Sequence, residues 1–136
     1  MREILFRGKK EIDGAWLIGE LSTAKYGKEK PQIRNEKHLF ERVKLETVGQ
    51  YTGVEDKNGK KIFEGDIVMV YNPDAKDVAI IGYENAAFMV YPHNGKIAKR
   101  TLWEYLHSDF AIEVIGNKYD NPDLLVSLEE YTIIKK

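Results

Sequence analysis

The turn around Asn58-Gly59 constrains the fold of this chain more than any other feature of its sequence. Asn-Gly is the strongest short-range signal for a β-hairpin, and here it lies in a polar cluster between the runs TVGQYTG and KIF. Gly65-Asp66 follows, where the glycine permits a backbone reversal and the aspartate can accept backbone hydrogen bonds as the strand IVMVY begins. Residues 49–71 are therefore predicted to form antiparallel strands joined by tight turns.

The strand after Gly65-Asp66 is apolar on both faces. Ile67 and Met69 point to one face and Val68 and Val70 to the other, which an exposed antiparallel strand does not tolerate. A second hairpin, VAIIGY and AAFMVY around Glu84-Asn85, has the same character. Either the terminal segments of the chain or a second subunit must cover these faces, and the sequence leaves both alternatives open.

The flanking segments predict further strands and one or two short helices. Asp13-Gly14 marks a tight hairpin in REILFRGKKEIDGAWLIGEL, and FAIEVIG is predicted to be a strand. TLWEYLH has helical spacing, with Thr101 and Glu104 in capping-box positions. In YDNPDLL, Asn121 is a candidate cap with Pro122 in the first turn, whereas EEYTIIKK is compatible with a helix end or an edge strand.

Length and composition indicate one compact domain over residues 1–136. A chain of 136 residues with 43% hydrophobic residues can build one core but has no room for a second full domain. The most polar run covers residues 22–42, contains Pro31 and has no sustained period. We interpret it as a long polar excursion that ends in a strand near residues 40–45.

Three blocks of the sequence resemble the YopX family of small phage and prophage proteins. They are REILFRG with WLIGEL, then ETVGQYTGVEDKNGKKIFEGDIV, and finally EVIGNKYDNPDLL, and they leave residues 22–42 and 73–100 as the divergent parts. The resemblance implies a prophage origin and a mostly β (α+β) fold, with an SH3-like small barrel, an additional N-terminal hairpin and one or two short helices. The family has no established biochemical activity that the resemblance could carry over.

Composition and charge narrow the functional classes. The chain has no cysteine, which excludes disulfides and thiolate sites and fits a reducing cytoplasm, and it contains no apolar run long enough for a signal peptide or a membrane span. The net charge is −1, but residues 21–44 carry seven basic and three acidic residues, whereas residues 104–130 carry one basic and seven acidic residues. Such a chain could bind another copy head to tail, or the two segments could neutralise each other within one fold.

No residue pattern points to catalysis, a metal or a cofactor. His38, His93 and His107 are scattered, and only His107 has a carboxylate nearby in sequence, at Asp109. The candidate carboxylates are explained by local roles at turns and helix starts; they are Asp56, Asp66, Asp120 and Asp123. We therefore predict a non-enzymatic protein without catalytic, cofactor-binding or metal-binding residues.

Two functional classes remain. The first is a protein-interaction or assembly module, self-associating or bound to a protein partner, because two-faced strands and eight tyrosines suit an interface. The second is a nucleic-acid-binding small barrel, in which lysines neutralise phosphates and an aromatic ring stacks on a base. Its candidate residues are Lys25, Tyr26, Lys28, Lys30, Arg34 and Lys37, interleaved with the acidic Glu29 and Glu36. No membrane partner is predicted.

Overall fold

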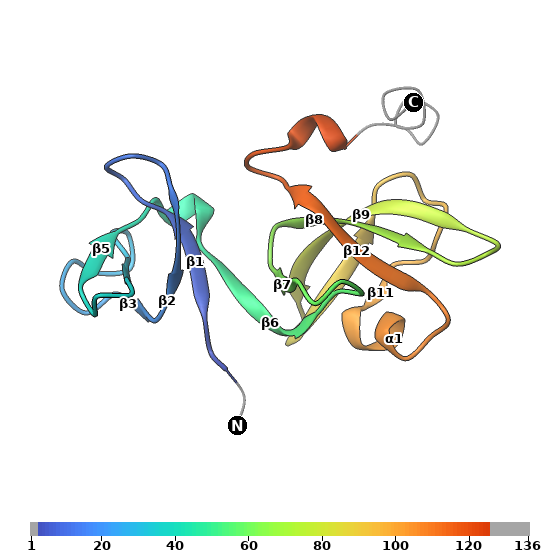
Figure 1. Ribbon diagram of the computed structural model, residues 1–136, viewed down its shortest axis with the longest axis horizontal. Coiled ribbons are helices and arrows are strands. Elements are labelled where there is room, and N and C mark those ends of the chain that lie inside the picture. The colour runs from blue at the N-terminus through green and yellow to red at the C-terminus, as the bar shows by residue number, and fades with distance from the viewer. Residues whose placement is uncertain (1–2, 126–136) are drawn as a thin grey trace. The chain divides into compact units, whose positions relative to one another are not determined.

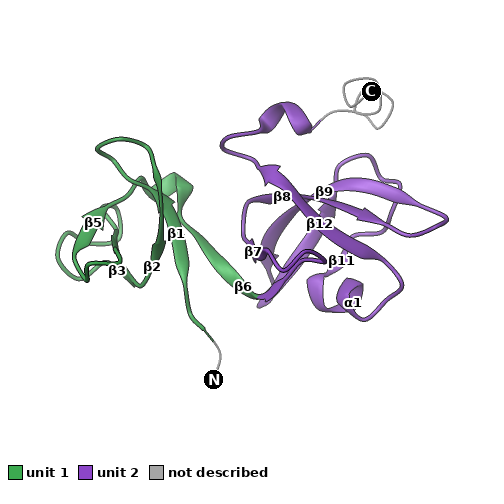
Figure 2. Ribbon diagram, in the orientation of Figure 1, with its two compact units in different colours: residues 1–53 green, residues 54–136 purple. Residues whose placement is uncertain are grey.

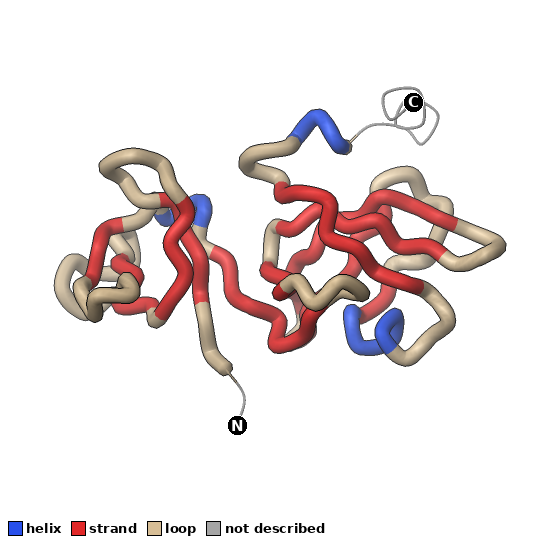
Figure 3. Tube along the Cα trace, viewed as in Figure 1, coloured by secondary structure: helices blue, strands red, loops and turns tan. Residues whose placement is uncertain are grey.

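The computed structural model describes residues 3–125, and its secondary structure is mostly β (Figures 1 and 3). Its first strands are β1 (Phe6–Lys9), β2 (Trp16–Gly19), β3 (Leu21–Ser22), β4 (Gln32–Arg34), β5 (Phe40–Arg42) and β6 (Gly49–Glu55). The later ones are β7 (Lys61–Phe63), β8 (Asp66–Tyr71), β9 (Lys76–Glu84), β10 (Ala87–Pro92), β11 (Arg100–Thr101) and β12 (Ala111–Asn117). The helical elements are η1 (Leu45–Thr47), α1 (Leu102–Leu106) and η2 (Pro122–Leu124).

These strands form antiparallel sheets ordered β2-β1-β6-β7, β11-β10-β9-β8-β12 and β3-β4-β5. The predicted mostly β class is therefore confirmed, and the SH3-like barrel stays a prediction. The chain divides into two compact units, unit 1 (Met1–Gly53) and unit 2 (Val54–Lys136), coloured green and purple in Figure 2. Strand β6 runs through the boundary between them. The single domain over residues 1–136 also stays a prediction, because two compact units can still fold and unfold together as one cooperative domain.

Unit 1 is built on the predicted N-terminal hairpin. Strands β1 and β2 pair in the register Phe6↔Gly19 to Lys9↔Trp16, and Gly14 adopts a φ of 75° in the turn. Beyond Gly19 the chain continues as β3, which pairs with β4, and β4 pairs with β5. A bridge between Lys10 and Val43 then links the end of β5 back to the end of β1. The chain from β3 to β5 thus begins at the end of β2 and is linked back to the end of β1.

The interpretation of residues 22–42 as a polar excursion is wrong in part. The segment contains β4 and β5, and Ile33 in β4 is 0% exposed. A β-carbon added to Gly8 would lie 3.1 Å from Val43 and 3.4 Å from Ile33, so these two side chains pack directly on the hairpin backbone. Strands of three residues are too short to show a period in the sequence, which is why the pattern gave no strand before residue 40.

Unit 2 is a five-stranded antiparallel sheet with α1 packed against it. The buried cluster is shared by β7, β8, β9, β10, α1 and β12; it contains Ile62, Val68, Val70, Ala79, Ile81, Val90, Leu102, Tyr105 and Ile112. The helix begins with the predicted capping box, in which Thr101 Oγ1 accepts from Glu104 N–H at 3.0 Å and Thr101 N–H donates to Glu104 at 3.1 Å. The first α-helical residues are thereby fixed at the edge of the sheet.

The hairpin loops confirm the predicted turns and refine one of them. The loop after β6 closes through Asp56 N–H donating to Lys60 O at 2.7 Å, with Gly59 at a φ of 81°. Between β9 and β10, Asn85 and Ala86 both have positive φ, 50° and 63°, so the turn is centred one residue later than predicted. Asn121 precedes η2 as predicted, but its Oδ1 accepts from Asn117 N–H at 3.2 Å instead of capping the helix. The predicted element EEYTIIKK lies outside the described residues.

The two apolar faces of β8 are covered largely by the chain itself. Ile67 on one face and Val68 and Val70 on the other are all 0% exposed, whereas Met69 and Tyr71 are only partly buried. A second subunit is therefore not needed to cover the buried residues of this strand. In residues 3–125 no helix is long and apolar enough to cross a membrane.

Candidate functional site

A hollow of unit 1 lies along β2, and we call it the β2 groove. Its volume is about 810 Å³, within the range of ligand-binding clefts. Two continuous runs, residues 16–20 and 34–38, form its walls together with Lys10 and Glu41. Because alternate residues of a strand point to opposite faces, a hollow lined by all four residues of β2 and by the following Glu20 runs along the edge of that strand.

Gly19 allows the two walls to meet at one end of the β2 groove. Arg34 N–H donates to Glu20 O at 2.9 Å, and a β-carbon on Gly19 would lie 2.2 Å from the carbonyl oxygen of Arg34. Only a residue without a side chain permits this approach. From that point towards Trp16, the edge of β2 and the β4–β5 turn form the two sides of the groove.

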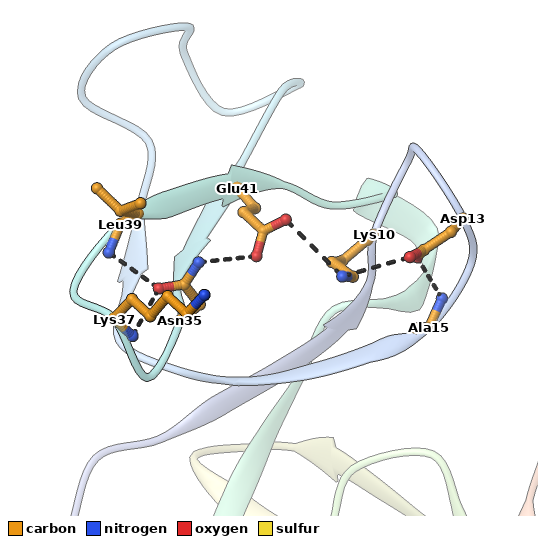
Figure 4. A network of polar contacts seen from close by, with 7 residues as sticks. All are labelled: Lys10, Asp13, Ala15, Asn35, Lys37, Leu39 and Glu41. Atoms are coloured by element: carbon orange, nitrogen blue, oxygen red, sulfur yellow. Dashed lines mark hydrogen bonds and ion pairs between the residues drawn. The ribbon is translucent and has the colours of Figure 1, made fainter.

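A polar network holds the far wall against the hairpin (Figure 4). Asn35 accepts backbone hydrogen bonds from Lys37 at 2.9 Å and Leu39 at 3.0 Å and donates to Glu41 at 2.9 Å. Lys10 joins this turn to the hairpin, with its Nζ 3.8 Å from Glu41 and 3.4 Å from Asp13. The backbone N–H of Ala15 and the neighbouring Lys10 hold the pKa of the Asp13 carboxyl below its ordinary value. The network thus links the β4–β5 turn to the N-terminal hairpin.

A second hollow of about 600 Å³ surrounds Tyr26. Lys25 and Arg42 lie over the Tyr26 ring at 5.2 and 5.4 Å, and Arg42 Nε is 3.2 Å from Glu11. The ring therefore already interacts with cations, and a nucleobase stacked on it would have to displace one of them or share the ring with it.

The six residues predicted to bind nucleic acid do not line one common hollow. Lys25 and Tyr26 line the second hollow, whereas Arg34 and Lys37 line the β2 groove. Lys28 and Lys30 are exposed in the β3–β4 loop and line neither of them. Arg34 is also 3.4 Å from Glu20 and lies 5.0 Å from the Phe40 ring, so part of its charge is compensated locally.

The three histidines lie in separate places. His38 sits in the β4–β5 turn at a φ of 65° and lines the β2 groove, and His93 follows β10 and donates its backbone N–H to Val78 O at 2.8 Å. His107 ends α1, where its ring stacks on Trp103 with centroids 4.2 Å apart. In residues 3–125, no group of three histidines or carboxylates is arranged to hold a metal ion.

The buried aspartates are engaged by backbone N–H groups. Asp56 accepts from Asn58, Lys60 and Val114 at 2.8–2.9 Å, and Asp66 accepts from Phe63 at 2.8 Å. Burial raises the pKa of the Asp56 carboxyl, but the backbone donors lower it, and the net pKa lies below the ordinary value. The predicted turn roles of Asp56 and Asp66 thus match their contacts.

Asp77 is a further buried carboxylate, 0% exposed, that no motif in the sequence marked. It accepts from Asn94 N–H and Lys96 N–H at 3.1 and 2.8 Å and holds the loop after β10. The edge of β2 was missed as well, although the hairpin predicted around Asp13-Gly14 includes this strand. Its position at the edge depends on the order of strands, which the local pattern does not encode.

Comparisons with known proteins agree with this architecture. A family model described as "YopX protein" matches residues 5–126. Among the solved structures, the crystal structure of protein EF1440 from Enterococcus faecalis is similar to 93% of this chain and 100% of its own, with a TM-score of 0.57 and 22% sequence identity. At that identity the likeness concerns the fold alone. No curated protein matches the chain.

Proposed function

This chain belongs to the YopX protein family, and on that premise we propose that it is a non-catalytic protein-interaction and assembly module of prophage type. We further propose that it acts in the cytoplasm as a homo-oligomer. The absence of cysteine suits a reducing compartment, and the local backbone roles of Asp56, Asp66 and Asp77 account for its buried carboxylates without a reaction.

An SH3-like core in unit 2 is part of this proposal. Its sheet order, β12-β8-β9-β10-β11, places the last strand beside the first, and α1 lies between β11 and β12. A five-stranded meander whose final strand returns to the first after a short helix is the connectivity of SH3-like barrels. Folds of this kind serve many functions, so the proposed activity rests on surfaces and not on the fold.

The separation of charge between the two units is the observation that carries the assembly proposal. Unit 1 contains eleven basic and eight acidic residues, net +3, and unit 2 contains ten basic and fourteen acidic residues, net −4. Exposed lysines of the β3–β4 loop contribute to the first charge, and exposed aspartates near β12 contribute to the second. Opposite charges on two parts of a chain favour a head-to-tail contact with another copy, in which different surfaces meet.

Charge-reversal variants test this contact. One variant reverses the basic side by three substitutions together, Lys25→Glu, Lys28→Glu and Lys30→Glu. The other variant reverses the acidic side by two, Asp109→Lys and Asp123→Lys. Each variant alone should lose the larger species that we expect for the native chain at low salt and behave as a 15.7 kDa monomer. An equimolar mixture should regain a larger species, because each variant offers the other a complementary surface.

The controls separate assembly from folding. Lys76→Glu with Lys96→Glu reverses two exposed lysines of the acidic unit and should leave the mass of the native assembly unchanged. Unchanged circular dichroism would show that all variants fold. If the reversals alter the stability of a monomer and never its mass, the charges meet within one chain and the assembly proposal is wrong.

Nucleic-acid binding is the second candidate, favoured by the exposure of Lys25, Lys28 and Lys30 in one loop. In that case Lys28→Glu with Lys30→Glu should weaken binding to single-stranded DNA of any sequence and reduce the salt slope. The readout is fluorescence anisotropy of a labelled oligonucleotide at several salt concentrations. An affinity that is unaffected by the two substitutions would exclude this loop as the binding surface.

A further inference from the structure

The hydrogen-bonding pattern of the N-terminal hairpin identifies the outer edge of β2. Lys10 N–H donates to Ala15 O at 2.9 Å, so these two residues form a hydrogen-bonded pair. The backbone N–H of Lys9 instead donates to Thr47 Oγ1 at 2.8 Å, and its backbone C=O accepts from Lys44 N–H at 2.8 Å. Both groups therefore point to the side away from β2. In an antiparallel ladder, hydrogen-bonded pairs alternate with non-hydrogen-bonded pairs, whose backbone groups point away from the partner strand. Lys9↔Trp16 is therefore a non-hydrogen-bonded pair, and the next one along the ladder is Arg7↔Ile18.

Ile18 therefore directs its backbone N–H and C=O away from β1, towards the edge where β2 ends the sheet. Within the described part of the chain, neither group has a backbone partner across this edge, and the Ile18 side chain is 51% exposed. Ile18 is one of the residues that line the β2 groove. A strand edge that presents a donor, an acceptor and an apolar side chain inside a groove is suited to pairing with an extended chain.

Charge in and beside the groove indicates which extended chain would bind. The basic residues are Arg7, Lys9, Lys10, Arg34 and Lys37, and the acidic residues are Asp13, Glu20, Glu36 and Glu41. Three of the four acids are already within 4.0 Å of Lys10 or Arg34 in ion pairs. Arg7 and Lys9 lie over the Trp16 ring at 4.9 and 5.4 Å, which places two further cationic side chains beside this end of the groove. A ligand with negative side chains complements it.

We propose that the β2 groove binds an extended acidic peptide of a partner protein by adding it as a strand to the outer edge of β2. The peptide residue opposite Ile18 exchanges two backbone hydrogen bonds with it and carries an apolar side chain, and the neighbouring residues carry carboxylates. The inference deepens the proposed interaction function by naming the chemistry of a partner. It is independent of the charge-dependent assembly, since Ile18 is not among the residues reversed in that experiment.

The probe is a five-residue peptide of alternating valine and glutamate, acetylated and amidated at its ends, titrated into ¹⁵N-labelled protein. We expect the largest amide shifts at Ile18 and along residues 16–20 and 34–38. The same peptide with an N-methyl group on its central valine keeps every side chain but loses the donor to Ile18 O, and it should bind about five- to tenfold more weakly. A peptide with lysine in place of glutamate should bind more weakly than either.

Ile18→Pro supplies a matched protein variant. Proline is tolerated on an edge strand where the N–H faces outward, so the hairpin ladder should persist while the peptide loses its donor. If this variant fails to fold, the N-methylated peptide still decides the matter with native protein. Equal binding of the two peptides, or no shift at residues 16–20, would overturn the proposal. Shifts of Ile18 that depend on protein concentration alone would assign the edge to a second copy, and shifts seen only with an oligonucleotide would assign it to nucleic acid.

Discussion

Replacement of Gly19 by alanine tests whether the close approach of β2 and β4 shapes the β2 groove. The added β-carbon would lie 2.2 Å from the carbonyl oxygen of Arg34, and relief to an ordinary contact requires the strands to separate by roughly 1 Å. The neighbouring hydrogen bond from Arg34 N–H to Glu20 O is 2.9 Å long, so this shift would break it. Loss of one hydrogen bond, about 1 kcal/mol, adds to about 1–3 kcal/mol of overpacking.

We therefore expect Gly19→Ala to destabilise unit 1 by about 2–4 kcal/mol, which is a shift of about 1–2 M in the urea midpoint. Gly14→Ala is the matched control, because Gly14 has a φ of 75° but nothing within 4 Å of the added β-carbon. Its cost should be limited to about 1 kcal/mol of backbone strain.

The two tryptophans allow each unit to be followed separately, since Trp16 lies in unit 1 and Trp103 in unit 2. Urea unfolding is monitored by fluorescence in Trp16→Phe and Trp103→Phe backgrounds. Coincident transitions would support the prediction of one cooperative domain, whereas separate ones would show that Gly19→Ala acts on unit 1 alone. If Gly19→Ala lowers the free energy of unfolding no more than Gly14→Ala does, the close approach of β2 and β4 does not require a glycine at position 19. Gly19 would then not shape the β2 groove.

Substitutions at two further positions test the turns. Asp56→Ala should cost about 2–4 kcal/mol, because three backbone N–H groups lose a charged acceptor, and Asp56→Asn should cost less. The pKa of the Asp56 carboxyl in the folded protein lies below its ordinary value. The contribution of this carboxyl to the free energy of unfolding is therefore present above about pH 4 and is lost as the pH falls through the folded pKa. Urea unfolding from pH 7 to pH 2.5 should show a shallower acid dependence in Asp56→Ala, and an unchanged dependence would contradict this role. Ala86→Gly should stabilise the chain by about 0.5–1 kcal/mol, because Ala86 has a φ of 63°, and a lower melting temperature than that of the native chain would contradict this.

The elements that the sequence predicted well are those with strong local chemistry. Asn58-Gly59, Gly65-Asp66 and the Thr101–Glu104 capping box each combine a backbone requirement with a residue that meets it, and all three lie where predicted. Strand β4 could not be found in this way, because Ile33 is its only fully buried residue and its neighbours are polar. Its place in unit 1 depends on pairing with strands from other parts of the chain.

The candidate site illustrates the same limit. The lysine-rich segment was visible in the sequence, but its residues divide between two hollows and an exposed loop once β4 and β5 form. The β2 groove arises from the order of strands, from the ladder register at Ile18 and from the missing side chain of Gly19. None of these follows from residue types alone, since register and strand order are set by long-range pairing.

The molar mass of the native chain in solution tests the proposed function most directly. It is measured by light scattering after size exclusion at low salt, with and without a short single-stranded DNA. We expect a mass several times 15.7 kDa that DNA leaves unchanged and that high salt reduces, because the proposed contact joins opposite charges. A monomer at low salt that shifts only when DNA is added would contradict the assembly module and make the lysines of the β3–β4 loop the binding surface.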